Sequence, residues 1–212
     1  MSNALIYFRG IEPAAVGLFK LLNSYGWHKM KALAELINKS SQGGFEERRA
    51  DFESVDVARE VIAGSILQIA YFAIKRHGEQ RDKSPNILHF EAEMNRLLRE
   101  SKRSRAKYFK LPPKFCVGRE VGPLPIGMFV YAGRNQYNHF DDDRLEVVNE
   151  VVFNYLEQIF PEPGNGKSFK VLGAGRPLSY SVISALGWLD SDRDSGFEYF
   201  KRDLSDMLKI EI

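Results

Sequence analysis

The feature that most constrains the fold is a long apolar stripe between residues 55 and 77. Apolar side chains recur there every three or four residues for about six helical turns. The members of the stripe are Val57, Val61, Ile62, Ile66, Ile69, Ala70 and Ala73. This spacing predicts one long helix over residues 55–77 that is buried along one face.

Two further helices are predicted before this one, over residues 12–22 and 27–37. Their apolar stripes consist of Ala15, Leu18, Phe19 and Leu22 in the first, and of Met30, Leu33, Ala34 and Ile37 in the second. The helical period is then lost over residues 40–54, where two adjacent glycines indicate a loop. Ser54 is the expected N-cap of the long helix.

Four more helices are predicted in the rest of the chain. Ser84–Pro85 begins the first of these, because proline is favoured at the first position of a helix. The others begin near Asp143, Leu178 and Phe197. We expect a loop over 114–125, a linker over 161–168 and one short strand over 168–172. Together these elements predict an all-α domain over residues 1–160 and a small, mostly helical C-terminal appendage over residues 161–212.

Composition excludes several classes of protein. The chain has 212 residues, a formal net charge of +2 and 44% apolar residues, which is typical of a globular protein. No apolar run approaches the roughly 20 residues needed to cross a bilayer, and the N-terminus lacks the pattern of a secretion signal. The single cysteine, Cys116, cannot form an internal disulfide. We therefore expect a cytoplasmic protein without a membrane partner.

Motifs for a metal or a cofactor are incomplete in this sequence. Residues 161–168 end like a phosphate-binding loop, but Pro161 stands where that motif needs its first glycine. The four histidines are scattered without a metal-binding pair, and Cys116 has no histidine partner nearby in the sequence. We expect no metal and no cofactor.

A basic stretch runs from Arg96 to Lys110 and contains seven basic residues and one acidic residue. Such a stretch can follow a phosphate backbone, and Tyr108 and Phe109 near its end offer faces for base stacking. It is equally typical of a solvated helix end, where cations complement the helix dipole. The candidate RNA-binding residues in it are Arg96, Arg99, Lys102, Arg103, Arg105 and Lys107.

A second signal for RNA is the segment RNQYNH at residues 134–139. It lies in a polar stretch between an apolar run and the helix expected from Asp143. Arg134 and His139 are the one arginine and histidine in the chain with this spacing, and Asn135 follows the arginine directly. Tyr137 and Asn138 lie close enough in the sequence to help bind RNA.

In this motif and in the helical pattern before it, the chain resembles the HEPN superfamily over about residues 1–160. The resemblance implies an up-and-down helical bundle and a metal-independent RNA endonuclease of toxin–antitoxin or antiviral defence systems. It implies a homodimer in which both copies of the motif face one cleft. We expect no second nuclease or antitoxin domain in this sequence, so regulation would come from another protein or from a phage trigger.

These residue types suit RNA cleavage because RNA carries its own nucleophile, the 2′-hydroxyl, and needs no metal ion. His139 is suited to proton transfer, which typically contributes about 10²–10⁴-fold to a rate. Arg134 is suited to the anionic phosphorane, since a guanidinium stays charged and binds two oxygens at once. Asn135 is suited to orienting the imidazole or to donating to a phosphate oxygen.

Helix geometry constrains the motif. Positions five apart lie about 140° apart around a regular helix, so Arg134 and His139 would not share a face. Either the motif is partly non-helical, as Gly133 allows, or two chains complete the site. In the structural alternative, the motif begins a helix, Arg134 pairs with a carboxylate of residues 141–143, and His139 is simply exposed.

The sequence leaves three functions open. The first is the ribonuclease described above. The second is a non-catalytic HEPN-like module that binds a nucleotide or RNA at the same motif. The third is a helical protein-interaction subunit in which the motif is only a structural turn.

Overall fold

The computed structural model describes residues 2–38, 44–79, 81–100, 108–140, 146–160, 177–189 and 195–211. Its helices are α1 (Asn3–Asn38), α2 (Phe45–His77), α3 (Pro85–Glu100), α4 (Ile126–Asn138), α5 (Val147–Ile159), α6 (Ser179–Ala185) and α7 (Ser195–Leu208). A 3-10 helix, η1 (Pro113–Phe115), and two short antiparallel strands, β1 (Glu120–Val121) and β2 (Leu124–Pro125), lie between α3 and α4. The predicted all-α fold is therefore confirmed.

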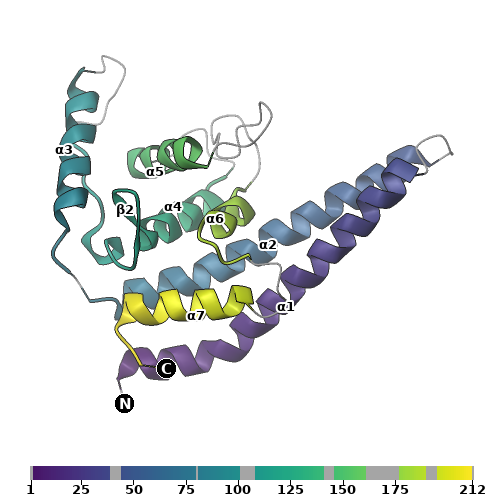
Figure 1. Cartoon of the computed structure of the whole chain (residues 1–212), viewed down its shortest axis with the longest axis horizontal. Helices are drawn as coiled ribbons and strands as arrows, with labels where there is room; N and C mark the ends of the chain where they lie inside the picture. Colours follow the sequence, from purple (N-terminus) through teal and green to yellow (C-terminus); the bar gives the residue numbers. More distant parts are fainter. Residues whose placement is uncertain are drawn as a thin grey trace.

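Helices α1 and α2 form a long antiparallel hairpin whose far half projects from the rest of the molecule (Figure 1). We call this far half, residues 23–38 and 45–61, the arm. No described residue of the arm is fully buried. An ion pair between Lys29 Nζ and Asp56 Oδ1, 2.5 Å apart, joins its two helices. α1 is one continuous helix where two were predicted.

The start of α2 corrects a prediction. The helix begins at Phe45 rather than at Val55, although it ends at His77 as predicted. Ser54 is therefore not an N-cap. Its hydroxyl donates instead to the carbonyl of Asp51 at 2.7 Å, inside the helix.

The first turns of α2 are stabilised by charge rather than by an apolar stripe. Glu46 and Glu47 complement the dipole at the helix N-terminus. Arg49 Nε lies 2.8 Å from Glu53 Oε1, one turn further along. Because these turns bury no apolar face, apolar periodicity could not detect them.

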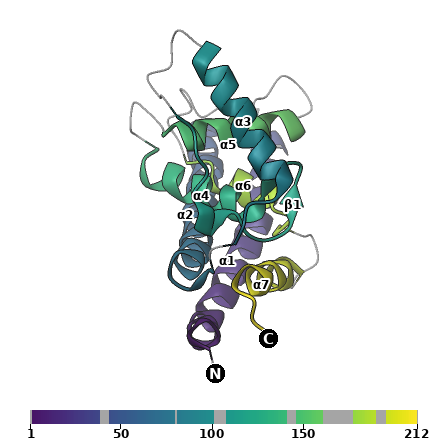
Figure 2. The same cartoon turned by 90° about the vertical axis from the view of Figure 1, so that its left-hand side faces the viewer.

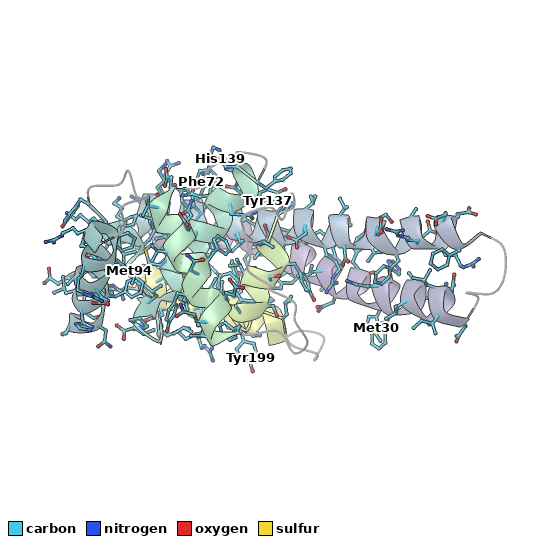
Figure 3. The ribbon with its side chains drawn as sticks, turned by 90° about the horizontal axis from the view of Figure 1, so that it is seen from above. Met30, Phe72, Met94, Tyr137, His139 and Tyr199 are labelled. Atoms are coloured by element: carbon cyan, nitrogen blue, oxygen red, sulfur yellow. The ribbon has the colours of Figure 1, made fainter. Side chains whose placement is uncertain are left out.

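The arm also carries an apolar stripe that faces away from the hairpin. Trp27 is 69% exposed, and Met30 and Ile37 are each 63% exposed. With Ala34, which is also exposed, they follow one another at spacings of three and four residues along α1. Met30 points away from α2 in Figure 3. The predicted stripe over residues 27–37 is therefore not buried in the core.

The core lies where α2 enters the body of the molecule. Ile66, Leu67 and Ala70 of α2 are fully buried there, and α4 and α6 pack against this part of the helix. α3 stands at the end of the body away from the arm (Figure 1). It begins at Pro85 as predicted.

The described part of the C-terminal segment contributes to the same core. Trp188 and Phe200 are fully buried, and Phe200 packs 5.4 Å from Phe19 of α1, centroid to centroid. Figure 2 shows α7 beside α1. Asp203 of α7 accepts a hydrogen bond from Trp188 Nε1 at 2.9 Å and forms an ion pair with Arg119 at 3.1 Å. Helices α6 and α7 match the two predicted there, whereas residues 161–176, including the predicted strand, lie outside the described residues.

One helix passes a membrane test by length and composition alone. The apolar window of α2 has a mean hydropathy of 1.5, and half of it is buried inside the protein. A core helix of a soluble protein passes the same test, so this finding is weak evidence for a span.

Helix α4 packs closely on α2 because glycines remove side chains from the contact. A Cβ on Gly64 of α2 would lie 2.4 Å from the ring of Tyr137. A Cβ on Gly133 of α4 would lie 2.9 Å from Leu67 Cδ1 and 3.0 Å from Val182 Cγ1. Two glycines on facing helices thus set how near the RNQYNH segment comes to α2.

This packing predicts opposite effects for two glycine-to-alanine substitutions. Gly64→Ala should destabilise the protein by about 1–3 kcal/mol, because the methyl group overpacks against Tyr137. Gly17→Ala, also within a helix but with open space around its Cβ, should stabilise it by about 0.5–1 kcal/mol. Urea unfolding measures both. Equal effects of the two substitutions would contradict the close contact.

Candidate functional site

The RNQYNH segment lies at the C-terminal end of α4. Arg134 and Asn135 are helical, whereas His139 is the C-cap residue, with φ −133° and ψ 30°. The chain therefore leaves the helical conformation at His139, so the motif is non-helical only at its last residue. Gly133, which would have allowed an earlier break, lies inside the helix and is buried. The motif ends a helix rather than beginning one.

The guanidinium of Arg134 is held by side chains of α2. It lies over the ring of Tyr71, with Cζ 4.5 Å from the ring centroid. Its Nε donates to Gln68 Oε1 at 3.2 Å, and its Nη1 donates to Asn135 Oδ1 at 3.2 Å. These contacts fix a partly buried cation in one orientation.

Asn138 closes the polar cluster on its exposed side. In one orientation of its amide, Oδ1 accepts from Gln68 Nε2 at 2.6 Å. In the other, the amide oxygen accepts from Arg134 Nη2 at 2.9 Å. Both orientations place Asn138 beside Gln68 and Arg134, one turn along α4 from the arginine. The predicted alternative pairing of Arg134 with residues 141–143 lies outside the described residues.

Asn135 is buried, and its amide contacts residues of the protein rather than solvent. Besides Arg134, it hydrogen-bonds to the hydroxyl of Tyr131. Tyr131 donates in turn to Glu146 Oε2 at 3.1 Å. Burial raises the pKa of Tyr131, and the Glu146 carboxylate raises it further. The Asn135 amide thus contacts both Arg134 and Tyr131, and its expected role toward the imidazole or a phosphate stays a prediction.

His139 and Tyr137 differ in their surroundings. The side chain of His139 is exposed, and its backbone N–H donates to the carbonyl of Gln136 at 3.2 Å. The ring of Tyr137 lies against Gly64, so only part of it reaches solvent. His139 lies at the same edge of the body as Phe72 of α2 (Figure 3). This edge combines a fixed cation, an exposed imidazole and an exposed aromatic ring.

The described start of the basic stretch, in α3, lies apart from this cluster. Arg96 Nη2 pairs with Glu93 Oε1 at 2.6 Å, and Arg99 is exposed. Figure 3 shows Met94 of the same helix at the end of the body, away from His139. The other predicted RNA-binding residues of this stretch, Lys102, Arg103, Arg105 and Lys107, lie outside the described residues.

Phe109 corrects a prediction made for the same stretch. We expected an exposed stacking face, but Phe109 is buried. Its N–H donates to Asn95 Oδ1 at 2.7 Å, and Asn95 Nδ2 donates to its carbonyl at 2.9 Å. The ring packs edge-on to Phe90. Tyr108, one position earlier, remains exposed.

Sequence reasoning missed the α2 side of the site. This side consists of Gln68, Tyr71, Phe72 and Lys75, which follow one another at helical spacing. The first two contact Arg134, and the other two contact the ring of Tyr71. A signal for them was present, because these polar and aromatic residues interrupt the apolar stripe of residues 55–77. It could not be separated from an ordinary amphipathic pattern until α4 was placed beside α2.

No group of three or more His, Cys, Asp and Glu side chains suited to a metal ion lies among the residues that the structure describes. No family model matches the chain, and neither a curated protein nor a solved structure matches it.

Cys116 is predicted to be unreactive. Burial raises the pKa of its thiol to about 11. At pH 8 only about one thiol in a thousand is then a thiolate, which is the reactive form. Modification by a disulfide reagent at pH 8 should be much slower in the native protein than in the protein unfolded in urea. Equal rates would show that the thiol is accessible and that its pKa is not raised.

Proposed function

We propose that the chain is a metal-independent RNA endonuclease with Arg134 and His139 as its catalytic residues. The observation that supports this most is the fixed guanidinium of Arg134, held against α2 by Tyr71 and Gln68, at the end of the helix where His139 is exposed. The resemblance to HEPN proteins extends the proposal to a cytoplasmic toxin or antiviral role, with RNA as substrate and a separate protein as regulator.

In the proposed reaction, the ribose 2′-oxygen attacks the adjacent phosphorus and the bond from phosphorus to the 5′-oxygen breaks. His139 accepts the proton of the 2′-hydroxyl, and the imidazolium so formed gives that proton to the leaving 5′-oxygen. Arg134 donates to the phosphate oxygens, whose charge grows in the transition state. The products carry a 2′,3′-cyclic phosphate and a 5′-hydroxyl.

The proposal predicts that His139→Ala lowers cleavage of a labelled RNA pool in EDTA by about 10²–10⁴-fold. Because His139 is exposed, the variant should unfold at the same urea concentration as the wild type. His28→Ala, which removes an exposed histidine of the arm, is the matched control and should leave cleavage unchanged.

Other outcomes assign the motif differently. RNA binding by wild type without any cleavage would contradict the nuclease and favour the non-catalytic binding module. Arg134→Lys keeps a cation near Tyr71 but loses the two-pronged donor. If that variant is less stable than the wild type, and the wild type itself neither binds nor cleaves RNA, the motif is structural.

As the partner we propose a second copy of this chain, in a homodimer that forms through the arm in place of the shared cleft that the resemblance implies. The exposed stripe on α1 is self-complementary about a two-fold axis. Antiparallel pairing sets Trp27 against Ile37 of the partner subunit, and Met30 against Ala34 of the partner subunit. The same stripe is the observation that favours the third function, a protein-interaction subunit, because exposed aromatic and methionine side chains are enriched at interfaces.

The dimer predicts a mass of about twice the 24.2 kDa of one chain in light scattering. Trp27→Glu should give the monomer mass, since it removes the largest apolar side chain of the contact and places a charge there. His28→Glu, on a neighbouring exposed face, should leave the dimer intact. A wild type that is already monomeric would contradict the arm as the dimer interface.

A further inference from the structure

We propose that the α2 face beside the motif binds one unpaired RNA strand, with a phosphate at Lys75 and Lys114 and a base on Phe72. This inference rests on the proposed function and names its substrate class and its binding residues. None of these three residues belongs to the RNQYNH segment or to the basic stretch of α3.

The first step of the argument is a group of cations around one ring. Lys75 Nζ lies 5.5 Å from the centroid of Tyr71, the same ring that carries Arg134 at 4.5 Å. Lys114 of η1 donates from Nζ to the carbonyl of Lys75 at 3.1 Å. Lys75 and Lys114 are both exposed. Lys75 of α2 and Lys114 of η1 thus add two positive charges to the end of α2 where Tyr71 contacts Arg134.

The second step is that the described carboxylates leave these charges uncompensated. Elsewhere in the body, lysines pair with acids, as Lys83 does with Glu91 and Lys201 with Glu12. Within the described ranges, Lys75, Lys114 and Arg134 form no such pair. Glu146, an acid on the α4 side of the site, accepts a hydrogen bond from Tyr131. An anion is therefore favoured beside these three cations, and phosphate is the anion that RNA supplies.

The third step is an aromatic face at the same place. Phe72 is 49% exposed, and its ring lies edge-on to Tyr71, with centroids 5.8 Å apart. It follows Gln68 by one turn of α2, and Gln68 contacts Asn138, the residue before His139. Binding sites for single strands combine cations that follow the backbone with aromatic rings on which bases stack.

The combination selects an unpaired strand. In a duplex, each base is stacked between its neighbours and paired to its partner, so its face cannot lie on Phe72. A strand bound through Lys75, Lys114 and Phe72 also passes the end of α4, where His139 is exposed. The proposed binding residues thus lead the substrate to the proposed catalytic residue.

The test measures binding of a fluorescent 12-nucleotide unpaired RNA by anisotropy, with His139→Ala as the background so that the strand stays intact. Phe72→Ala should raise the Kd about 5- to 150-fold, the range for loss of one base–aromatic stack. Lys75→Ala should weaken binding. It should also reduce the slope of log Kd against log salt concentration by about 0.7, the value for one phosphate contact with a single strand. Lys31→Ala and Leu88→Ala remove an exposed lysine and an exposed apolar residue elsewhere, and should leave the Kd unchanged.

Several results overturn the inference. The first two are failure of the unpaired RNA to bind and equal affinity for a duplex of the same sequence. The others are an unchanged Kd in both α2 variants and displacement of the RNA by an acidic peptide as readily as by unlabelled RNA.

The binding proposal and the nuclease proposal can fail separately. Binding that depends on Phe72 and Lys75, in a wild type that cuts no RNA, refutes the nuclease and leaves the binding site standing. Cleavage that is indifferent to both variants refutes only the binding site.

Discussion

The close contact between α4 and α2 is the constraint on which the rest of the site depends. Gly64 lets the ring of Tyr137 lie on the backbone of α2, and Gly133 lets Leu67 and Val182 meet α4 without a side chain between them. At this separation the Arg134 guanidinium reaches the ring of Tyr71 and the amide of Gln68. A larger side chain at either glycine would push the two halves of the site apart.

The same contact explains how an arginine can be partly buried and still be available for the proposed reaction. Hydrogen bonds to Gln68 and Asn135 and the face of Tyr71 replace part of the water that the cation loses. A guanidinium that is already oriented needs no rearrangement when charge develops on a phosphate. His139, by contrast, stands outside the helix, where a strand can reach it.

Sequence reasoning predicted the all-α class, the end of α2 at His77 and the start of α3 at Pro85, because apolar spacing and proline report on local structure. It failed where stability comes from elsewhere. The first turns of α2 depend on Glu46 and Glu47, and the stripe of Trp27 and Met30 lies outside the core. The α2 half of the site depends on which helix packs beside it, which a local pattern does not encode. Whether the motif acts on RNA stays a prediction.

The most direct test of the central claim compares two substrates of one sequence, an unmodified RNA and its 2′-O-methyl form, in EDTA. If the 2′-hydroxyl is the nucleophile, wild-type protein cuts the unmodified RNA and leaves 2′,3′-cyclic phosphate ends. The methylated RNA binds but stays intact, because its nucleophile is blocked. Cleavage of the methylated RNA, ends that carry a 3′-hydroxyl, or no cleavage of either substrate would contradict the account.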